Sequence, residues 1–230
     1  MTLLSSFEWQ ALWLSFKVAT RSVLFALPLA IAVAWILART RFAGKVLFDG
    51  LVHMPLVLPP VVVGYLLLLL FGARGPIGAW LYDAFGLRLV FTSAGASLAT
   101  AVMSFPLMVR AIRLAIEAVD TGLEQAAATL GAGPLDRFAT ITLPLMLPGV
   151  LSGAVVAFAA SLGEFGAVIT FVSNIPGETQ TLPLAIYSAV QTPGGEASAA
   201  RLAALSMVLA LAGLVAAELA ARRVRQMLGR

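Results

Sequence analysis

The sequence predicts an all-α integral membrane protein with about five transmembrane helices, and three observations support this fold class. Of the 230 residues, 60% are hydrophobic and only 11% are charged, whereas a soluble domain is about half apolar and about one quarter charged. Five apolar stretches are long enough to cross a bilayer, which takes about 20 residues each. Lysine and arginine residues concentrate in alternate loops between these stretches, as the positive-inside rule predicts.

The composition excludes several other classes. A chain this apolar cannot remain disordered, because too much apolar surface would face water. Cysteine is absent, which excludes a disulfide framework, a thiolate metal site and a cysteine nucleophile. The net charge of +4 is better explained by membrane orientation than by nucleic acid, so we expect no nucleic-acid partner.

The first two predicted spans cover residues 12–38 and 51–71. Pro55, Pro59 and Pro60 lie within the second span and are expected to bend or break it, because proline cannot continue the helical hydrogen-bond pattern. Residues 1–10 carry Glu8 and no positive charge, and no small-residue cleavage site follows. We therefore expect no signal peptide and expect the first span to remain in the mature protein.

The remaining spans are predicted at residues 89–109, 141–162 and 202–217. Residues 179–195 form a sixth apolar piece that is weakly hydrophobic and contains Pro183 and Pro193. We expect this piece to be a short surface helix or a re-entrant element, although a six-span protein remains possible. The whole chain, residues 1–230, is predicted to form a single transmembrane domain.

The orientation follows from the basic residues in the loops. Ten fall on one side of a five-span arrangement, namely Arg39, Arg41, Lys45, Arg110, Arg113, Arg137, Arg222, Arg223, Arg225 and Arg230, and three fall on the other, namely Arg74, Arg88 and Arg201. This bias predicts that the N-terminus lies outside and the C-terminus inside. A sixth crossing would place the Arg-rich tail on the wrong side.

The cytoplasmic loop at residues 117–144 is predicted to be structured. Thr121 and Glu124 match a capping box, in which each side chain caps the other's exposed amide. A short alanine-rich helix then follows to Leu130, and glycine at position 131 favours a left-handed helix end. A second helix is expected from Pro134 to about residue 143, so the segment is predicted to be a helix–turn–helix.

The run EQAAATLGAGPLDRFATITLP at residues 124–144 resembles the EAA signature of permease subunits of binding-protein-dependent ABC importers. Gln125 stands at the usual glutamate position, and Glu124 lies one residue earlier. In that family the segment is the coupling helix, which sits in a cleft of the ATPase subunit. The resemblance implies coupling roles for Glu124, Gln125, Ala126, Ala127, Gly131, Ala132, Gly133, Pro134, Ile141, Leu143 and Pro144.

A phosphate-binding GxxxxGK[ST] loop is absent from the sequence, so ATP hydrolysis is expected from a separate chain. We therefore expect a transport subunit that is not itself an enzyme and carries no cofactor. An ABC importer permease of type I architecture in a bacterial inner membrane is implied by the resemblance.

Three further stretches are similar to a narrower group, the molybdate permease subunits. These stretches are residues 53–68, 104–115 and 161–196. The resemblance implies a homodimer with two ATP-binding cassette subunits beneath it, a periplasmic molybdate-binding protein above it, and membrane lipid around it. Sulfate or thiosulfate permeases share a looser version, and tungstate is too close to molybdate in charge and size to separate.

Spans two to five contain almost no basic residue in their interiors, which suits a conduit that must release an anion. The candidate pathway or gate residues are Pro59, Pro60, Gly64, Ser104, Pro106, Ser161, Gly163, Glu164, Phe165, Gly166, Thr170 and Asn174. Small and hydroxyl residues also mark ordinary helix contacts in membranes, which is the alternative interpretation. Glu164 would repel an anion, so we expect it at the outer end of span four, within a dimer contact, against the binding protein or in water.

Two other functional classes fit less well. A secondary anion transporter would need charged or proton-relay residues at mid-membrane, and these are scarce. A membrane-embedded enzyme would need paired carboxylates, cysteines or clustered histidines. His53 is the only histidine, and no acidic partner or metal site is evident for it.

Overall fold

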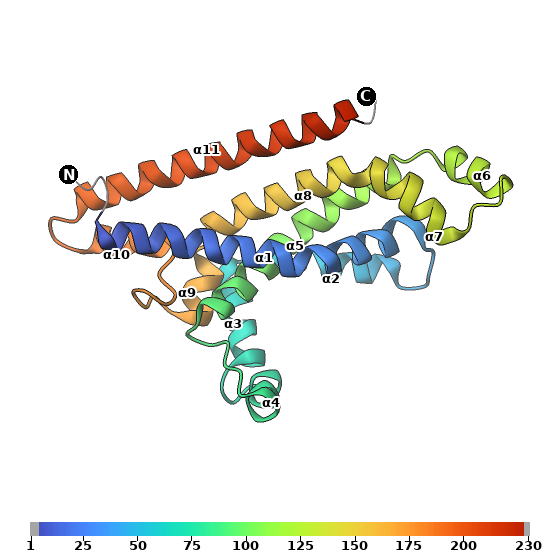
Figure 1. Cartoon of the computed structure of the whole chain (residues 1–230). Coiled ribbons are helices and arrows are strands. Elements are labelled where there is room, and N and C mark those ends of the chain that lie inside the picture. Colours follow the sequence, from blue (N-terminus) through green and yellow to red (C-terminus); the bar gives the residue numbers. More distant parts are fainter. Residues whose placement is uncertain (1–4, 228–230) are drawn as a thin grey trace.

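The computed structural model describes residues 5–227, and every regular element in that range is helical (Figure 1). In chain order the elements are α1 (Ser6–Arg39), α2 (Lys45–Val57), α3 (Pro60–Phe71), α4 (Pro76–Phe85), α5 (Ser93–Glu117), α6 (Thr121–Thr129), α7 (Pro134–Arg137), the π-helical turn η1 (Phe138–Thr142), α8 (Leu143–Gly163), α9 (Gly166–Val172), α10 (Leu182–Gln191) and α11 (Glu196–Met227).

Four helical segments of the described chain are long and apolar enough to cross a membrane. They are α1, α5, the continuous segment Pro134–Gly163 and the Glu196–Ala216 part of α11. The pair α2 and α3 passes the same test only when taken together, which gives up to five spans. The predicted count of about five is therefore confirmed, and the predicted sixth piece is the short apolar helix α10.

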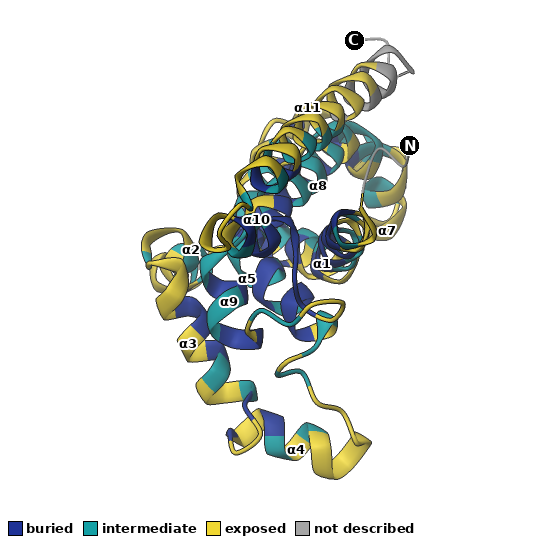
Figure 2. Cartoon of the chain, turned by 90° about the vertical axis from the view of Figure 1, so that its left-hand side faces the viewer, coloured by how far each residue is buried: buried dark blue, intermediate teal, exposed yellow. Residues whose placement is uncertain are grey.

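The centre of the bundle is α5, which packs against both α1 and α8. Small residues allow the close approach of α8. A side-chain carbon added to Gly149 would lie 2.2 Å from the Cβ of Ala115, and one added to Gly153 would lie 3.2 Å from the Cβ of Ala111. Such contacts are typical of membrane helix interfaces, where small residues let backbones approach. By contrast, α11 packs on α8 and α10 and is exposed along most of its length (Figure 2).

The second predicted span is sharply broken. The chain bends by 113° between α2 and α3, and the break falls at Leu58 and Pro59, neither of which is helical. A residue that precedes proline is pushed out of the helical region, which explains the conformation of Leu58. Pro55 lies inside α2 without interrupting it, so only the two later prolines mark the break. Beyond the break, α3 packs against α9, and α4 lies away from the rest of the bundle (Figures 1 and 2).

One end of the bundle gathers the loops that were predicted to be basic. At this end α1 and α5 stop, α2 begins, and α6 and α7 connect α5 to α8 (Figure 1). The last described turns of α11 point to the same side (Figure 1). This arrangement agrees with the predicted clustering of basic residues on a single face of the membrane.

Candidate coupling segment and translocation pathway

The start of α6 differs from the predicted capping box. Asp120 is the residue before the helix, and its Oδ1 accepts a hydrogen bond from the Gly122 amide at 2.8 Å. Thr121 is instead the first helical residue. The predicted reciprocal pair of Thr121 and Glu124 is therefore wrong, because the Glu124 carboxylate points to other elements of the fold.

The end of α6 confirms the predicted glycine turn. Gly131 has a φ of +88°, in the left-handed region that favours glycine. Its amide donates to the Ala128 carbonyl at 3.1 Å, and the Ala132 amide donates to the Ala127 carbonyl at 3.0 Å. These two bonds form a Schellman motif, which satisfies the last carbonyls of the helix.

The predicted second helix is not a separate element. Pro134 begins α7, but the chain then passes through the π-helical turn η1 directly into α8, as one continuous 30-residue segment. In η1 the Leu143 amide donates to the Phe138 carbonyl. This wider pattern precedes Pro144, which has no amide hydrogen to continue an α-helical ladder. The helix–turn–helix is therefore a short helix joined to the first turns of span four.

Glu124 connects α6 to two other elements. Its Oε1 accepts hydrogen bonds from Arg39 Nη2 at 2.9 Å and from Thr142 Oγ1 at 2.5 Å. The Arg39 guanidinium also lies over the Trp35 ring at 5.7 Å, and Trp35 meets the Phe138 ring edge-on at 5.1 Å. Among the described residues, Glu124 provides the only side-chain hydrogen bonds between α6 and other elements.

The remaining surface of α6 is open. The helix has no buried residue, and Leu130 and Leu135 after it are 88% and 83% exposed. The other predicted coupling residues lie on or beside this surface: Gln125, Ala126, Gly131, Gly133, Pro134 and Leu143 are exposed, whereas Ala127, Ala132, Ile141 and Pro144 are half-buried. A short alanine-rich helix with exposed leucines at its end can dock into a groove of another protein.

Four predicted pathway residues come together where α3 meets α9. A side-chain carbon added to Gly64 would lie 2.6 Å from the Ala167 carbonyl oxygen and 2.8 Å from the Thr170 Cβ. One added to Gly166 would lie 2.7 Å from the Cβ of Pro60. The glycines therefore permit a backbone approach that no larger residue allows, directly beyond the break at Pro59.

Two other predicted pathway residues lie deep inside the bundle. Ser161 Oγ donates to Ser104 Oγ at 3.4 Å and lies 3.2 Å from Ser22 Oγ. All three serines are buried, and they come from α8, α5 and α1. In this conformation they join three helices, and a pathway role for Ser104 and Ser161 stays a prediction. Pro106 is also buried, within an unbroken α5.

Several residues after α8 make polar contacts with α9 and α10. Glu164 follows α8 directly, and its Oε1 accepts the Ala167 amide at 2.9 Å, so it caps the start of α9. Phe165 packs against the Tyr187 ring of α10 at 5.2 Å. Asn174 Nδ2 donates to Ser188 Oγ at 2.7 Å, and Gly163 has open space around it.

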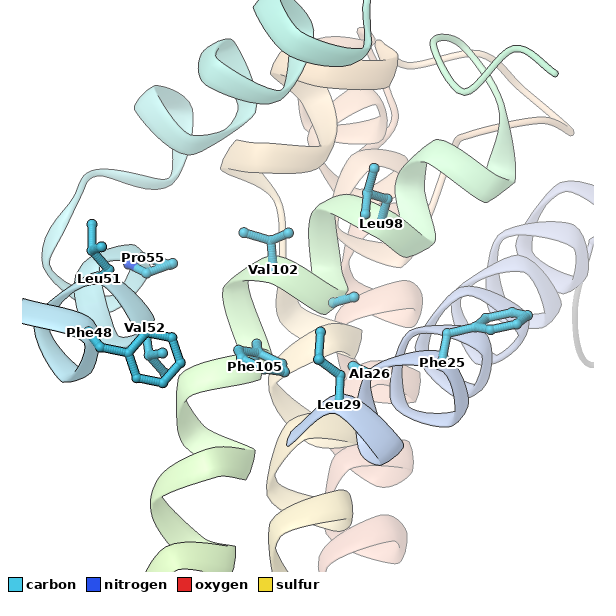
Figure 3. A pocket seen from close by; sticks show the side chains of 11 residues that line it. Phe25, Ala26, Leu29, Phe48, Leu51, Val52, Pro55, Leu98, Val102 and Phe105 are labelled. Carbon is cyan, nitrogen blue, oxygen red and sulfur yellow. The ribbon is translucent and has the colours of Figure 1, made fainter. Parts of the chain in front are cut away.

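An apolar groove separates α1 from α2 across the surface of α5 (Figure 3). It encloses about 460 Å³, and its walls include Leu29, Phe48 and Val102. Its lining includes no charged or hydroxyl side chain, so it offers an oxyanion no hydrogen-bond donor.

Sequence reasoning missed several polar partners. From the sequence, Arg39 was interpreted only as one of the basic residues that indicate the orientation in the membrane. Thr142 occupies the variable position of the Ile-x-Leu-Pro run. Asp49 lies one helical turn before His53, and this spacing could have indicated a contact between the two side chains. Asp49 Oδ1 is 3.0 Å from His53 Nδ1, and Asp49 Oδ2 is 3.0 Å from Arg113 Nη1. Within residues 5–227 no group of three or more His, Cys, Asp or Glu side chains could hold a metal.

This architecture of packed spans with a short helix at one end is that of a multi-pass membrane protein. The chain belongs to the family described as "Binding-protein-dependent transport system inner membrane component", whose model matches residues 26–226. It is thus a multi-pass inner-membrane component of an ABC transporter, and membership implies ATPase and binding-protein partners.

Within this family the chain is similar to molybdenum permeases. It is 62% identical over 223 residues to the Molybdenum transport system permease protein ModB of Escherichia coli strain K12, with 97% of each chain covered. Identity to the protein of the same name from Haemophilus influenzae is 58% over 222 residues, with 96% of this chain and 97% of that one covered. The Sulfate transport system permease protein CysT of Escherichia coli strain K12 is 37% identical over 180 residues, which cover 77% of this chain and 65% of that one.

A solved structure has the same fold. The crystal structure of a bacterial ABC transporter involved in the import of the acidic polysaccharide alginate matches with a TM-score of 0.76, covering 96% of this chain and 80% of that chain. The sequence identity is 19%, so this likeness concerns the fold. The predicted ABC importer permease architecture is confirmed.

Proposed function

We propose that the chain is the transmembrane subunit of an ATP-driven importer that carries molybdate across the inner membrane. The observation that supports this most strongly is the similarity to two molybdenum permeases over nearly the whole chain, at 62% and 58% identity. The sulfate permease is both less similar and matched over a shorter region. Sulfate, thiosulfate and tungstate are the alternative substrates that the uptake experiment distinguishes.

The proposed assembly is a homodimer of this chain. One chain contains one coupling segment, so two copies would engage two ATP-binding cassette subunits beneath the membrane. A periplasmic molybdate-binding protein would deliver the anion from the other side. The C-terminus and residues 117–144 would lie in the cytoplasm and the N-terminus in the periplasm, because the basic loops gather at one end of the bundle.

We assign the docking of the ATPase to the exposed surface of α6 and the turn that follows it. Gln125 is exposed, whereas Glu124 is half-buried and bonded to Arg39 and Thr142. Gln125 therefore contributes the polar contact to the ATPase, and Glu124 holds the helix in place. The exposed leucines at positions 130 and 135 provide apolar contact area.

We place the gate at the joint between α2 and α3 and at the α3–α9 contact. Broken helices in transporters line pathways or move during the cycle. The small residues at this contact leave backbone groups close to the joint, so an anion would meet dipoles and no fixed positive charge. Such a lining lets the anion leave again, as conduction requires.

The test is uptake of labelled molybdate into proteoliposomes that contain the chain with its ATPase subunits and binding protein. We expect uptake that requires ATP and resists an excess of sulfate. Equal competition by sulfate would move the substrate assignment to the sulfate group. Uptake by the chain alone on an ion gradient, without ATP, would contradict the importer proposal and favour a secondary transporter.

A further inference from the structure

Arg39 ends the longest helix of the bundle and meets the coupling helix at its centre. We infer that Arg39 is a positioning residue for energy coupling, which ties α1 to α6 through Glu124 so that the two helices move together. This inference rests on the proposed function, since it assumes that an ATPase displaces α6. It adds a second route for that displacement, besides the covalent connections of α6 to α5 and α7.

The contacts around Arg39 fix its guanidinium from two directions. Nη2 donates to Glu124 Oε1 at 2.9 Å, while the guanidinium lies over the Trp35 ring. Only about one fifth of the Arg39 and Glu124 side chains is exposed. A charge-assisted hydrogen bond in a partly dehydrated place is stronger than a surface pair, since water competes less for it.

The position of α6 depends on this pair because little else holds the helix. No residue of α6 is buried, so hydrophobic packing cannot fix its location on the bundle. Thr142 adds a second bond to the same oxygen of Glu124, which brings the π-helical turn into the contact. One carboxylate thus connects α6 with both α1 and the start of span four.

The other end of the connection is rigid. Towards its C-terminal end α1 is packed through Ala30, Ala34 and Leu37, each fully buried against the core that includes α5. Closely packed interiors transmit displacement and do not absorb it. Further along α1, Ser22 contacts Ser161 of α8. A shift of α6 would therefore reach the centre of the bundle along α1 as well as through α8.

The first test measures uptake and ATP hydrolysis in the reconstituted complex with the variants Arg39→Gln and Glu124→Gln. We expect each to assemble and hydrolyse ATP while molybdate taken up per ATP falls about tenfold, within the usual range of coupling between sites. The charge exchange R39E with E124R should restore most of the ratio. Arg222→Gln is the control, because Arg222 pairs with Glu218 one turn away on α11 itself.

Two outcomes would overturn the inference. One is an unchanged ratio of uptake to hydrolysis in Arg39→Gln. The other is an assembled charge-exchange protein that stays as uncoupled as the single variants. A purely structural pair would instead lower the amount of assembled complex and leave the ratio in the assembled fraction unchanged.

A second readout does not depend on the substrate. The chain has no cysteine, so Thr40→Cys with Thr121→Cys would place spin labels only at the ends of α1 and α6. Each copy in the homodimer carries both labels, so we compare the distance within one chain. We expect this distance to stay narrow with and without ATP, and to become broad when Arg39→Gln is added. A distance that changes with ATP in the otherwise unaltered chain contradicts the inference, even if the transported anion proves not to be molybdate.

Discussion

Gly64 of α3 lies so close to Ala167 of α9 that a side-chain carbon at position 64 would be 2.6 Å from the Ala167 carbonyl oxygen. Backbone has no freedom to move aside as a flexible side chain would, so an added methyl group must separate the helices. This contact is beside the joint that we propose as the gate.

The variant Gly64→Ala is therefore expected to lose stability by about 1–3 kcal/mol, the usual cost of overpacking, and to lose most ATP-driven uptake. Thermal unfolding in detergent and molybdate uptake measure the two effects. Gly50→Ala is the matched control, because a side chain at Gly50 meets nothing within 4 Å. Equal uptake by both variants would show that the α3–α9 distance is irrelevant to transport.

A bulky residue at Gly131 should uncouple transport. The left-handed conformation at φ +88° costs a residue with a side chain about 1–2 kcal/mol, so Gly131→Val would distort the turn beside the ATPase surface. We expect normal protein in the membrane and little ATP-driven uptake. Gly86→Val serves as the comparison, since Gly86 also has a left-handed φ of +65° and open space but ends α4, away from α6. Unchanged uptake in Gly131→Val would count against the coupling role.

The exposed leucines after α6 should be needed for ATPase binding. Leu130→Asp introduces a charge on a side chain that contacts no core, so folding should be unaffected while co-purification of the ATPase subunit falls at least about tenfold. Leu87→Asp is a suitable control, because Leu87 is also exposed but follows α4. Full retention of the ATPase by Leu130→Asp would place the docking surface elsewhere.

The buried serines should act chiefly as helix contacts. Ser161→Ala removes both hydroxyl contacts, and such bonds in membrane proteins average about 0.6 kcal/mol. We expect a small fall in thermal stability and near-normal uptake. A large loss of uptake at unchanged stability would instead indicate that the hydroxyl lines the pathway.

The ion pair of Asp49 and Arg113 should hold α2 against α5. Both side chains are about one third exposed, so a double-mutant cycle with Asp49→Asn and Arg113→Gln should give a coupling of at most about 1 kcal/mol. High salt should reduce this coupling, because solvent ions screen a partly exposed pair. A coupling of zero at low salt would mean that another contact positions α2.

Much of the fold could be predicted because hydropathy and charge act over whole segments. Residues 12–38 and 202–217 correspond to α1 and α11, and the paired prolines mark the break between α2 and α3. The capping residue of α6 was mispredicted, and the π-helical turn between Pro134 and span four was not predicted. Both features depend on contacts between segments far apart in the sequence, such as those of Glu124 with Arg39 and Thr142. Local sequence patterns do not indicate such contacts.

In the candidate sites too, local features could be predicted from the sequence and long-range contacts could not. The left-handed turn at Gly131 follows from local chemistry and was predictable. The contact between Ser22 and Ser161 joins positions 139 residues apart, and the bond from Arg39 to Glu124 spans 85 residues. Such contacts depend on how the helices pack, so no spacing in the sequence indicates them.

The break between α2 and α3 has a consequence for the cost of dehydrating the backbone. A gap in a membrane helix normally leaves amide donors without acceptors, and each costs several kcal/mol away from water. Here Pro59 and Pro60 have no amide hydrogen to leave unpaired, and the amides of Val62 and Val63 both donate to the Pro59 carbonyl, at 2.8 and 3.3 Å. The angle between the two helices can therefore change while few amide donors lose an acceptor, whether the joint lies in water or in lipid.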